Sequence, residues 1–103
     1  MNQHIVMNGQ IVTVGGTSAS APIVASGLAL LNDLLVNVGK GTIGWIHPVL
    51  YGAQMSSWTD VTLGGSYGCG NDESGGFPAT SGWDPSTGVG TPSLAKLKDY
   101  YGV

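Results

Sequence analysis

A turn rich in glycine and hydroxyl groups near the start of the chain is the first candidate for chemistry. Ser18 follows Gly15 and Gly16, between a β-branched run that predicts a strand over 11–14 and an apolar stretch that predicts one helix over 19–38. A hydroxyl at a helix N-terminus lies beside unpaired N–H groups and the positive end of the helix dipole. This setting suits a nucleophile whose reaction builds an oxyanion next to it.

The same residues have a simpler interpretation as helix caps. Thr17, Ser18 or Ser20 could accept a hydrogen bond from the first free N–H groups, because serine and threonine are preferred at such positions. Pro22 is suited to the first turn of a helix. On local physics alone capping is the commoner role, so both interpretations stay open at this point.

Two aspartates, Asp60 and Asp84, bracket a second stretch that is rich in glycine and serine. Calcium accepts carboxylates together with backbone carbonyls, and such a loop gains order from a bound cation. The alternative is that Asp84, which precedes Pro85, simply begins a turn. The chain has no contiguous EF-hand pattern, and Asn71, Asp72 and Glu73 are expected to form a solvated loop tip.

These residues need elements to position them, and the patterning predicts several. Runs at 4–7 and 11–14 flank Asn8-Gly9, a strong hairpin signal. The helix over 19–38 is apolar on nearly every face, which predicts burial on more than one side, and Gly39 ends it. A short helix is predicted over 46–51, an ordered loop packed around its aromatic residues over 56–90, and a last helix over 94–101 capped by Ser93.

Composition excludes several classes of function. Charged residues make up only 9 % of the 103, the net charge is −3, and the three basic residues are lysines, so a nucleic-acid partner is not expected. So few charges predict that much of the chain lies against other protein. No signal peptide is visible at the start, and the apolar core over 21–31 is too short to span a bilayer, so the sequence predicts a buried core helix and no membrane partner.

The segment over 16–22, Gly-Thr-Ser-Ala-Ser-Ala-Pro, resembles the nucleophile motif of subtilisin-like serine peptidases. It is most similar to the sedolisins, the serine-carboxyl peptidases that include tripeptidyl-peptidases. The resemblance implies that Ser18, not Ser20, attacks the scissile carbonyl of a protein or peptide substrate. It also implies an α/β fold: the C-terminal portion of a subtilisin-like three-layer fold, with a parallel sheet between helices and a long buried helix after the nucleophile.

The second stretch also resembles this family, at its C-terminal calcium region. Asp60-Val61-Thr62, the segment 76–79, Gly82-Trp83-Asp84-Pro85 and the segment 87–92 follow its order and spacing. The resemblance implies one Ca²⁺ ion held by the side chains of Asp60 and Asp84 and the carbonyls of Val61, Thr80 and Gly82, with water completing the shell. Thr80 stands where the family often has glycine.

In the sedolisins the base is a glutamate supported by an aspartate, and a further aspartate helps to hold the oxyanion. All three precede the nucleophile by a long way, and this chain has no carboxylate before Ser18. Its one glutamate is Glu73, and both His4 and His47 are expected to be structural. A carboxylate base suits acidic pH, where a histidine is protonated.

The sequence therefore predicts a C-terminal fragment of a peptidase catalytic domain over 1–103, which partners the missing N-terminal part and is inactive alone. Within it, 1–14 forms a hairpin or strands, 15–38 the nucleophile turn and helix, and 56–92 the calcium-binding loop region. A non-catalytic, calcium-stabilised truncated or pseudo-peptidase module is the alternative. A binding module unrelated to peptidases would require both motifs to be coincidental.

The single cysteine, Cys69, cannot form a bridge within the chain. It is either an inert thiol or, as resemblance to a secreted peptidase implies, half of a disulfide with a partner elsewhere. The same resemblance implies an extracellular or lysosome-like, acidic location.

Overall fold

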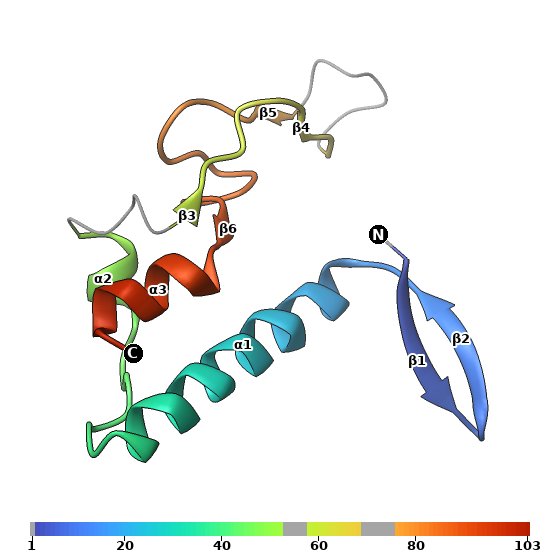
Figure 1. Ribbon diagram of the computed structural model, residues 1–103. Coiled ribbons are helices and arrows are strands. Elements are labelled where there is room, and N and C mark those ends of the chain that lie inside the picture. The colour runs from blue at the N-terminus through green and yellow to red at the C-terminus, as the bar shows by residue number, and fades with distance from the viewer. Residues whose placement is uncertain (1, 53–57, 69–75) are drawn as a thin grey trace. The chain divides into compact units, whose positions relative to one another are not determined.

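A computed structural model describes residues 2–52, 58–68 and 76–103 of the chain (Figure 1). The chain forms two compact units, an N-terminal unit over 1–42 and a C-terminal unit over 43–103. The mixture of helices and short sheets agrees with the predicted α/β class. Cys69 and the predicted loop tip at 71–73 lie outside the described residues.

The N-terminal unit begins with a two-stranded antiparallel hairpin of β1 (Gln3–Met7) and β2 (Gln10–Val14) (Figure 1). Asn8 and Gly9 join the strands with φ values of 52° and 75°, as a type I′ turn requires, so the predicted hairpin is confirmed. Each face of the hairpin carries an apolar pair, Ile5 with Val12 on one face and Val6 with Ile11 on the other. On one face Val6 pairs with Ile11, and these side chains are 73 % and 74 % exposed.

The helix α1 (Thr17–Asn37) follows the hairpin and ends as predicted before Gly39. Its buried residues, Gly27, Leu31 and Leu35, recur every four positions and therefore form a single stripe along the helix. Other apolar side chains are exposed, among them Leu30 at 65 %. The predicted burial on more than one side is therefore not seen, because among the described residues nothing covers the other faces.

The prediction that this apolar stretch is too short for a membrane was wrong. The uninterrupted run over 21–31 is short, but the helix continues past Asn32 and Asp33 to 21 residues, and it is long and apolar enough to cross a membrane by length and composition. The core helix of a soluble protein meets the same criteria. Length and composition therefore do not decide the environment of α1.

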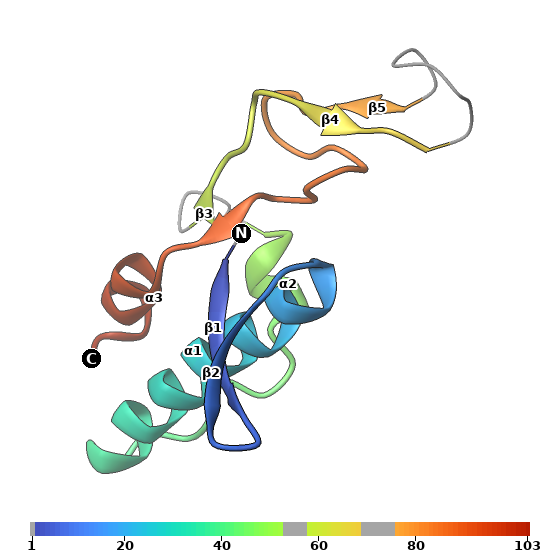
Figure 2. The same cartoon turned by 90° about the vertical axis from the view of Figure 1, so that its right-hand side faces the viewer.

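The C-terminal unit contains the short helix α2 (His47–Leu50), two antiparallel ribbons and the helix α3 (Leu94–Tyr101) (Figure 2). The strand β3 (Trp58–Thr59) pairs with β6 (Thr91–Pro92), and β4 (Gly65–Ser66) pairs with β5 (Phe77–Pro78). Two-residue strands containing glycine and proline show no alternation, so the sequence predicted only a packed loop. Every strand pair in the described part of the chain is antiparallel, and the predicted parallel sheet does not form there.

The last helix was predicted correctly at both ends. The Ser93 hydroxyl accepts a hydrogen bond from the Lys96 N–H at 3.5 Å, and Gly102 adopts the left-handed conformation with φ 71°. Leu97 on this helix is fully buried, and Ala79 and Val89 are the other buried apolar residues of the unit. A cap, a buried leucine and a terminal glycine together explain why so short a helix forms.

Candidate nucleophile and calcium loop

The predicted nucleophile is the second residue of α1 and is exposed to solvent. The residue before the helix is Gly16, with φ 130° and ψ 162°, a conformation essentially restricted to glycine. No side chain caps this helix, so the capping interpretation of Thr17, Ser18 and Ser20 is wrong. The Ser18 hydroxyl is therefore not used in closing the helix.

Pro22 lies inside α1 and not in its first turn as predicted. Proline has no N–H, so it cannot donate to the carbonyl of Ser18 four residues earlier. The Ser26 hydroxyl in turn donates to the Pro22 carbonyl at 2.7 Å. The Ser18 carbonyl therefore lacks the backbone N–H donor that it would have in a regular helix. This break in the hydrogen bonding lies at the candidate nucleophile itself.

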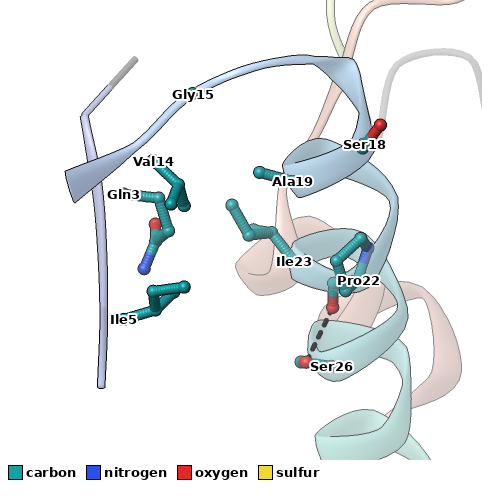
Figure 3. A pocket seen from close by; sticks show the side chains of 9 residues that line it. All are labelled: Gln3, Ile5, Val14, Gly15, Ser18, Ala19, Pro22, Ile23 and Ser26. Atoms are coloured by element: carbon teal, nitrogen blue, oxygen red, sulfur yellow. Dashed lines mark hydrogen bonds between the residues drawn. The ribbon is translucent and has the colours of Figure 1, made fainter. Parts of the chain in front are cut away.

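A pocket of about 430 Å³ opens between the hairpin and the first turns of α1 (Figure 3). Val14 and Ile5 point into it from the strands, and Ala19 and Ile23 face them from the helix. Ser18 lies at its rim, with its hydroxyl oxygen directed outward (Figure 3). The candidate nucleophile is therefore accessible and borders an apolar recess.

The N-terminal unit offers Ser18 no nearby base. Its one acidic side chain is Asp33, which lies fifteen residues further along α1, or about 22 Å at 1.5 Å per residue. Asp33 accepts a hydrogen bond from the Asn37 amide at 3.3 Å. His4 sits on β1 outside the pocket lining.

His47 belongs to the C-terminal unit and is held there by aromatic stacking. Its ring centroid lies 4.2 Å from that of Trp45 and 6.2 Å from that of Tyr51, with small interplanar angles. These contacts support the structural role expected for this histidine.

Asp84, the second predicted calcium ligand, is only 1 % exposed. Its carboxylate accepts hydrogen bonds from the N–H groups of Thr80 at 3.1 Å, Ser86 at 2.9 Å and Thr87 at 2.8 Å, and from the Thr87 hydroxyl. Burial alone would raise the pKa of this group, but these hydrogen bonds outweigh it and hold the pKa below its usual value. Asp84 is thus a charged centre around which the segment 80–87 is folded.

Asp60 contacts the same segment through Gly82. Its Oδ2 accepts the N–H of Gly82 at 2.7 Å, and the side chain is otherwise exposed. Four of the five predicted ligand residues, all but Val61, are thus joined in two hydrogen-bonded pairs, Asp60 with Gly82 and Asp84 with Thr80. Val61 directly follows Asp60 in the chain and is half-buried.

The donor set fits calcium in its chemistry, since it consists of two carboxylates and carbonyl oxygens only. Asp60 keeps acceptor capacity, whereas both Asp84 oxygens are engaged with protein donors. No group of three or more His, Cys, Asp or Glu side chains suited to a metal occurs in the described ranges. A cation here therefore has to rely on backbone oxygens, as the predicted set does.

Sequence reasoning missed the polar residues that organise this loop. The N–H groups of Ser86 and Thr87 donate to the Asp84 carboxylate, as in an Asx turn. The order Asp-Pro-Ser-Thr at 84–87 is a sequence pattern from which this turn could have been predicted. The Ser86 hydroxyl also donates to the Phe77 carbonyl at 2.6 Å and accepts the Ser66 N–H at 3.2 Å. No local pattern predicts this second link, because Ser66 lies twenty residues away.

The nucleophile turn, which contains Ser18, and the aspartate loop, which contains Asp60 and Asp84, carry the resemblance to the sedolisins, and comparison with known proteins shows homology to this family. The chain is homologous to a short part of fungal sedolisins, the serine-carboxyl peptidases that its motifs resemble. No family model matches the chain.

Three relatives carry this conclusion. The chain is 45 % identical over 95 residues to tripeptidyl-peptidase SED1 of Arthroderma otae, covering 92 % of this chain and 14 % of that protein. It is 39 % identical over 110 residues to tripeptidyl-peptidase sed4 of Aspergillus fumigatus, covering 93 % and 18 %. It is 45 % identical over 96 residues to aorsin of Aspergillus oryzae, covering 93 % and 14 %.

The chain thus spans less than a fifth of the length of each of these relatives. A match that covers 92 % of 103 residues spans the positions of Ser18, Asp60 and Asp84, because each lies more than eight residues from either end. Both motifs therefore belong to the homologous part.

Proposed function

We propose that this chain is the C-terminal part of a serine-carboxyl peptidase, supplying the nucleophile and a calcium site for proteolysis at acidic pH. The observation that carries the proposal is Ser18. It stands exposed after a glycine turn at the start of α1, with no capping role, inside a segment homologous to tripeptidyl-peptidases.

In this reaction Ser18 Oγ attacks the scissile carbonyl carbon, and its proton passes to a carboxylate base. The tetrahedral intermediate collapses by expelling the amine, which takes up that proton, and leaves an acyl-serine that water then hydrolyses. The N–H groups at the start of α1 and the helix dipole favour negative charge beside Ser18. The base and the oxyanion aspartate lie in the remainder of the catalytic domain, which is also the partner of this chain.

The proposed fold of the assembled domain is the subtilisin-like three-layer α/β sandwich. Its mainly parallel sheet would take in the hairpin, which carries an apolar pair on each face, and other layers would bury the exposed faces of α1. The exposure of Val6, Ile11 and Leu30 supports this arrangement. An extracellular or lysosome-like location follows from the same proposal.

We further propose one Ca²⁺ ion at the side chains of Asp60 and Asp84 and the carbonyls of Val61, Thr80 and Gly82. When bound, the ion would supply positive charge to these oxygen ligands and so would stabilise a loop region with little regular structure. The clustering of Asp60, Thr80, Gly82 and Asp84 supports this ligand set.

A chimeric enzyme tests the function directly. The homologous segment of tripeptidyl-peptidase SED1 of Arthroderma otae is replaced by this chain, and tripeptide release is measured between about pH 3 and 5. The chimera is expected to be active, and Ser18→Ala to reduce kcat by at least about a thousandfold, as loss of a nucleophile does. Ser20→Ala is the matched control and is expected to retain activity. A folded chimera in which Ser18→Ala is harmless would contradict the proposal.

The isolated chain is expected to show no peptidase activity, because the nearest acidic side chain of its unit is about 22 Å from Ser18 along α1. That distance also supports a second candidate, a calcium-stabilised truncated or pseudo-peptidase module without turnover. Hydrolysis of an unstructured peptide by the purified chain, lost in Ser18→Ala, would contradict both the expected inactivity and this second candidate.

A further inference from the structure

We infer that the Thr87 hydroxyl competes with the cation for the Asp84 carboxylate and so sets the affinity of the proposed calcium site. The inference rests on the calcium site proposed above and adds to it a residue outside the ligand set. Thr87 is half-buried and lies in the turn that follows Asp84 in the C-terminal unit.

The Asp84 carboxylate is enclosed by donors of the protein. Its Oδ1 accepts the N–H groups of Ser86 at 2.9 Å and Thr87 at 2.8 Å, and its Oδ2 accepts the N–H of Thr80 at 3.1 Å. The Thr87 hydroxyl lies 3.2 Å from Oδ1 and 3.1 Å from Oδ2. Among the described residues that donate to this carboxylate, Thr87 alone contacts both oxygens.

These donors match the accepting capacity of the carboxylate. An ionised carboxylate has about four lone-pair positions, and a hydroxyl has one proton, which points at one oxygen at a time. Two N–H groups already use Oδ1, so the proton of the Thr87 hydroxyl completes Oδ2. A cation bound by Asp84 therefore has to take the position of one of these donors.

The hydroxyl is the donor that can give way. An N–H group moves only with the backbone, and the turn after Asp84 is closed by two further hydrogen bonds. The Gly88 N–H donates to the Asp84 carbonyl at 2.9 Å, and the Asp84 N–H donates to the Gly88 carbonyl at 3.2 Å. Releasing the N–H of Ser86 or Thr87 would disturb this turn and leave a backbone donor without a partner. The Thr87 hydroxyl needs only a rotation about its own C–O bond to turn from Oδ2 to Oδ1.

Thr87 therefore has opposite effects on the folded loop and on cation binding. Without a cation, its hydroxyl completes the hydrogen bonding of a buried charge and stabilises the loop. When a cation binds, that hydrogen bond is weakened, and the weakening reduces the net binding free energy. A residue that only supported the loop would instead affect stability and cation affinity in the same direction.

The test is Thr87→Val, which removes the hydroxyl and keeps a β-branched side chain of similar size. Isothermal titration of calcium chloride into the whole chain is expected to give a Kd about fivefold lower than that of the unmodified chain. With chelator, the melting temperature of the variant is expected to fall by about 5 °C.

Two further variants are the controls. Thr87→Ser keeps the hydroxyl and is expected to keep the Kd of the unmodified chain. Thr91→Val makes the same chemical change at an exposed threonine of β6, and it is expected to change neither the Kd nor the melting temperature. Circular dichroism checks that each variant is folded.

An unchanged or higher Kd in folded Thr87→Val would overturn the inference and leave the calcium site in place. If the unmodified chain binds no calcium, the proposed site and the inference are both wrong. Where Thr87→Val does not fold with chelator, the same substitution is made in the chimeric enzyme. The rise in melting temperature that calcium causes is then expected to be larger than in the parent chimera. An equal or smaller rise would overturn the inference.

Discussion

The starts of α1 and α3 show two different uses of serine at a helix N-terminus. At α3, Ser93 accepts the Lys96 N–H and closes the first turn. At α1 the corresponding position is Gly16, no side chain caps the helix, and Ser18 remains exposed. A hydroxyl that caps no helix is available for chemistry, so the missing cap is consistent with the nucleophilic role that we propose for Ser18.

The two candidate sites also differ in whether their polar groups are already hydrogen-bonded within the protein. Polar groups of the aspartate loop satisfy one another, and Asp84 is buried with four donor groups around it. The nucleophile turn instead combines an exposed hydroxyl, a proline inside the helix and an apolar pocket. Hydrogen bonds within the unit hold the aspartate loop, whereas the catalytic role that we propose for the turn requires a base that its own unit does not place near Ser18.

The largest effect is expected from Asp84→Asn, which tests whether the Asp84 carboxylate holds the aspartate loop together. An amide cannot accept on both sides, so at least one of the Thr80, Ser86 and Thr87 N–H groups would face another donor. The melting temperature is expected to fall by more than about 10 °C. The matched control is Asp99→Asn, an exposed carboxylate on α3 expected to change little. Similar melting curves for the two variants would refute a central role for Asp84.

Calcium is expected to have the next largest effect. At a calcium concentration one hundred times its Kd, linkage stabilises the folded chain by about 2.7 kcal/mol. Differential scanning calorimetry with calcium and with chelator measures this stabilisation. Asp60→Asn is expected to reduce the shift in melting temperature that calcium causes. A melting temperature that is the same with calcium and with chelator would contradict the proposed calcium site.

Gly16→Ala tests the turn itself. An alanine in this backbone conformation costs about 2 kcal/mol, so the first turn of α1 should open more often. Hydrogen exchange of the Ala19 amide, which donates to the Gly16 carbonyl at 3.1 Å, reports this opening. Gly41→Ala is the control, because no positive φ and no close neighbour restrict that position. Unchanged exchange in Gly16→Ala would show that the turn tolerates a side chain.

The smallest expected effect is that of acid. Because the folded pKa of Asp84 lies below its ordinary value of 3.8, the stabilisation is complete above that value and is lost as pH falls through the lower folded pKa. A protonated Asp84 keeps the shape of the side chain and part of its capacity to accept hydrogen bonds. Protonation is therefore expected to lower the free energy of unfolding by less than Asp84→Asn does. Chemical denaturation from pH 5 to pH 2 measures the loss, and an equal loss in Asp84→Asn would assign it to other groups.

The elements that follow from local patterns were predictable. Asn8-Gly9 specified the hairpin, Gly39 the end of α1, and Ser93 with Gly102 both ends of α3. The two-residue pairs β3–β6 and β4–β5 were not, because they join residues far apart in the chain and lack alternation. The pocket beside Ser18 was not predicted either, since it needs strand and helix to face each other.

The sequence by itself determined the chemistry-bearing residues, the homologous family and most helix and hairpin boundaries, because glycines, caps and turn dipeptides act through neighbouring backbone atoms. Only the tertiary structure decided that Ser18 caps nothing, that α1 buries one stripe, and that Asp60 and Asp84 meet the same loop. Those facts depend on which distant groups come within hydrogen-bonding or packing distance, and one-dimensional spacing does not specify that.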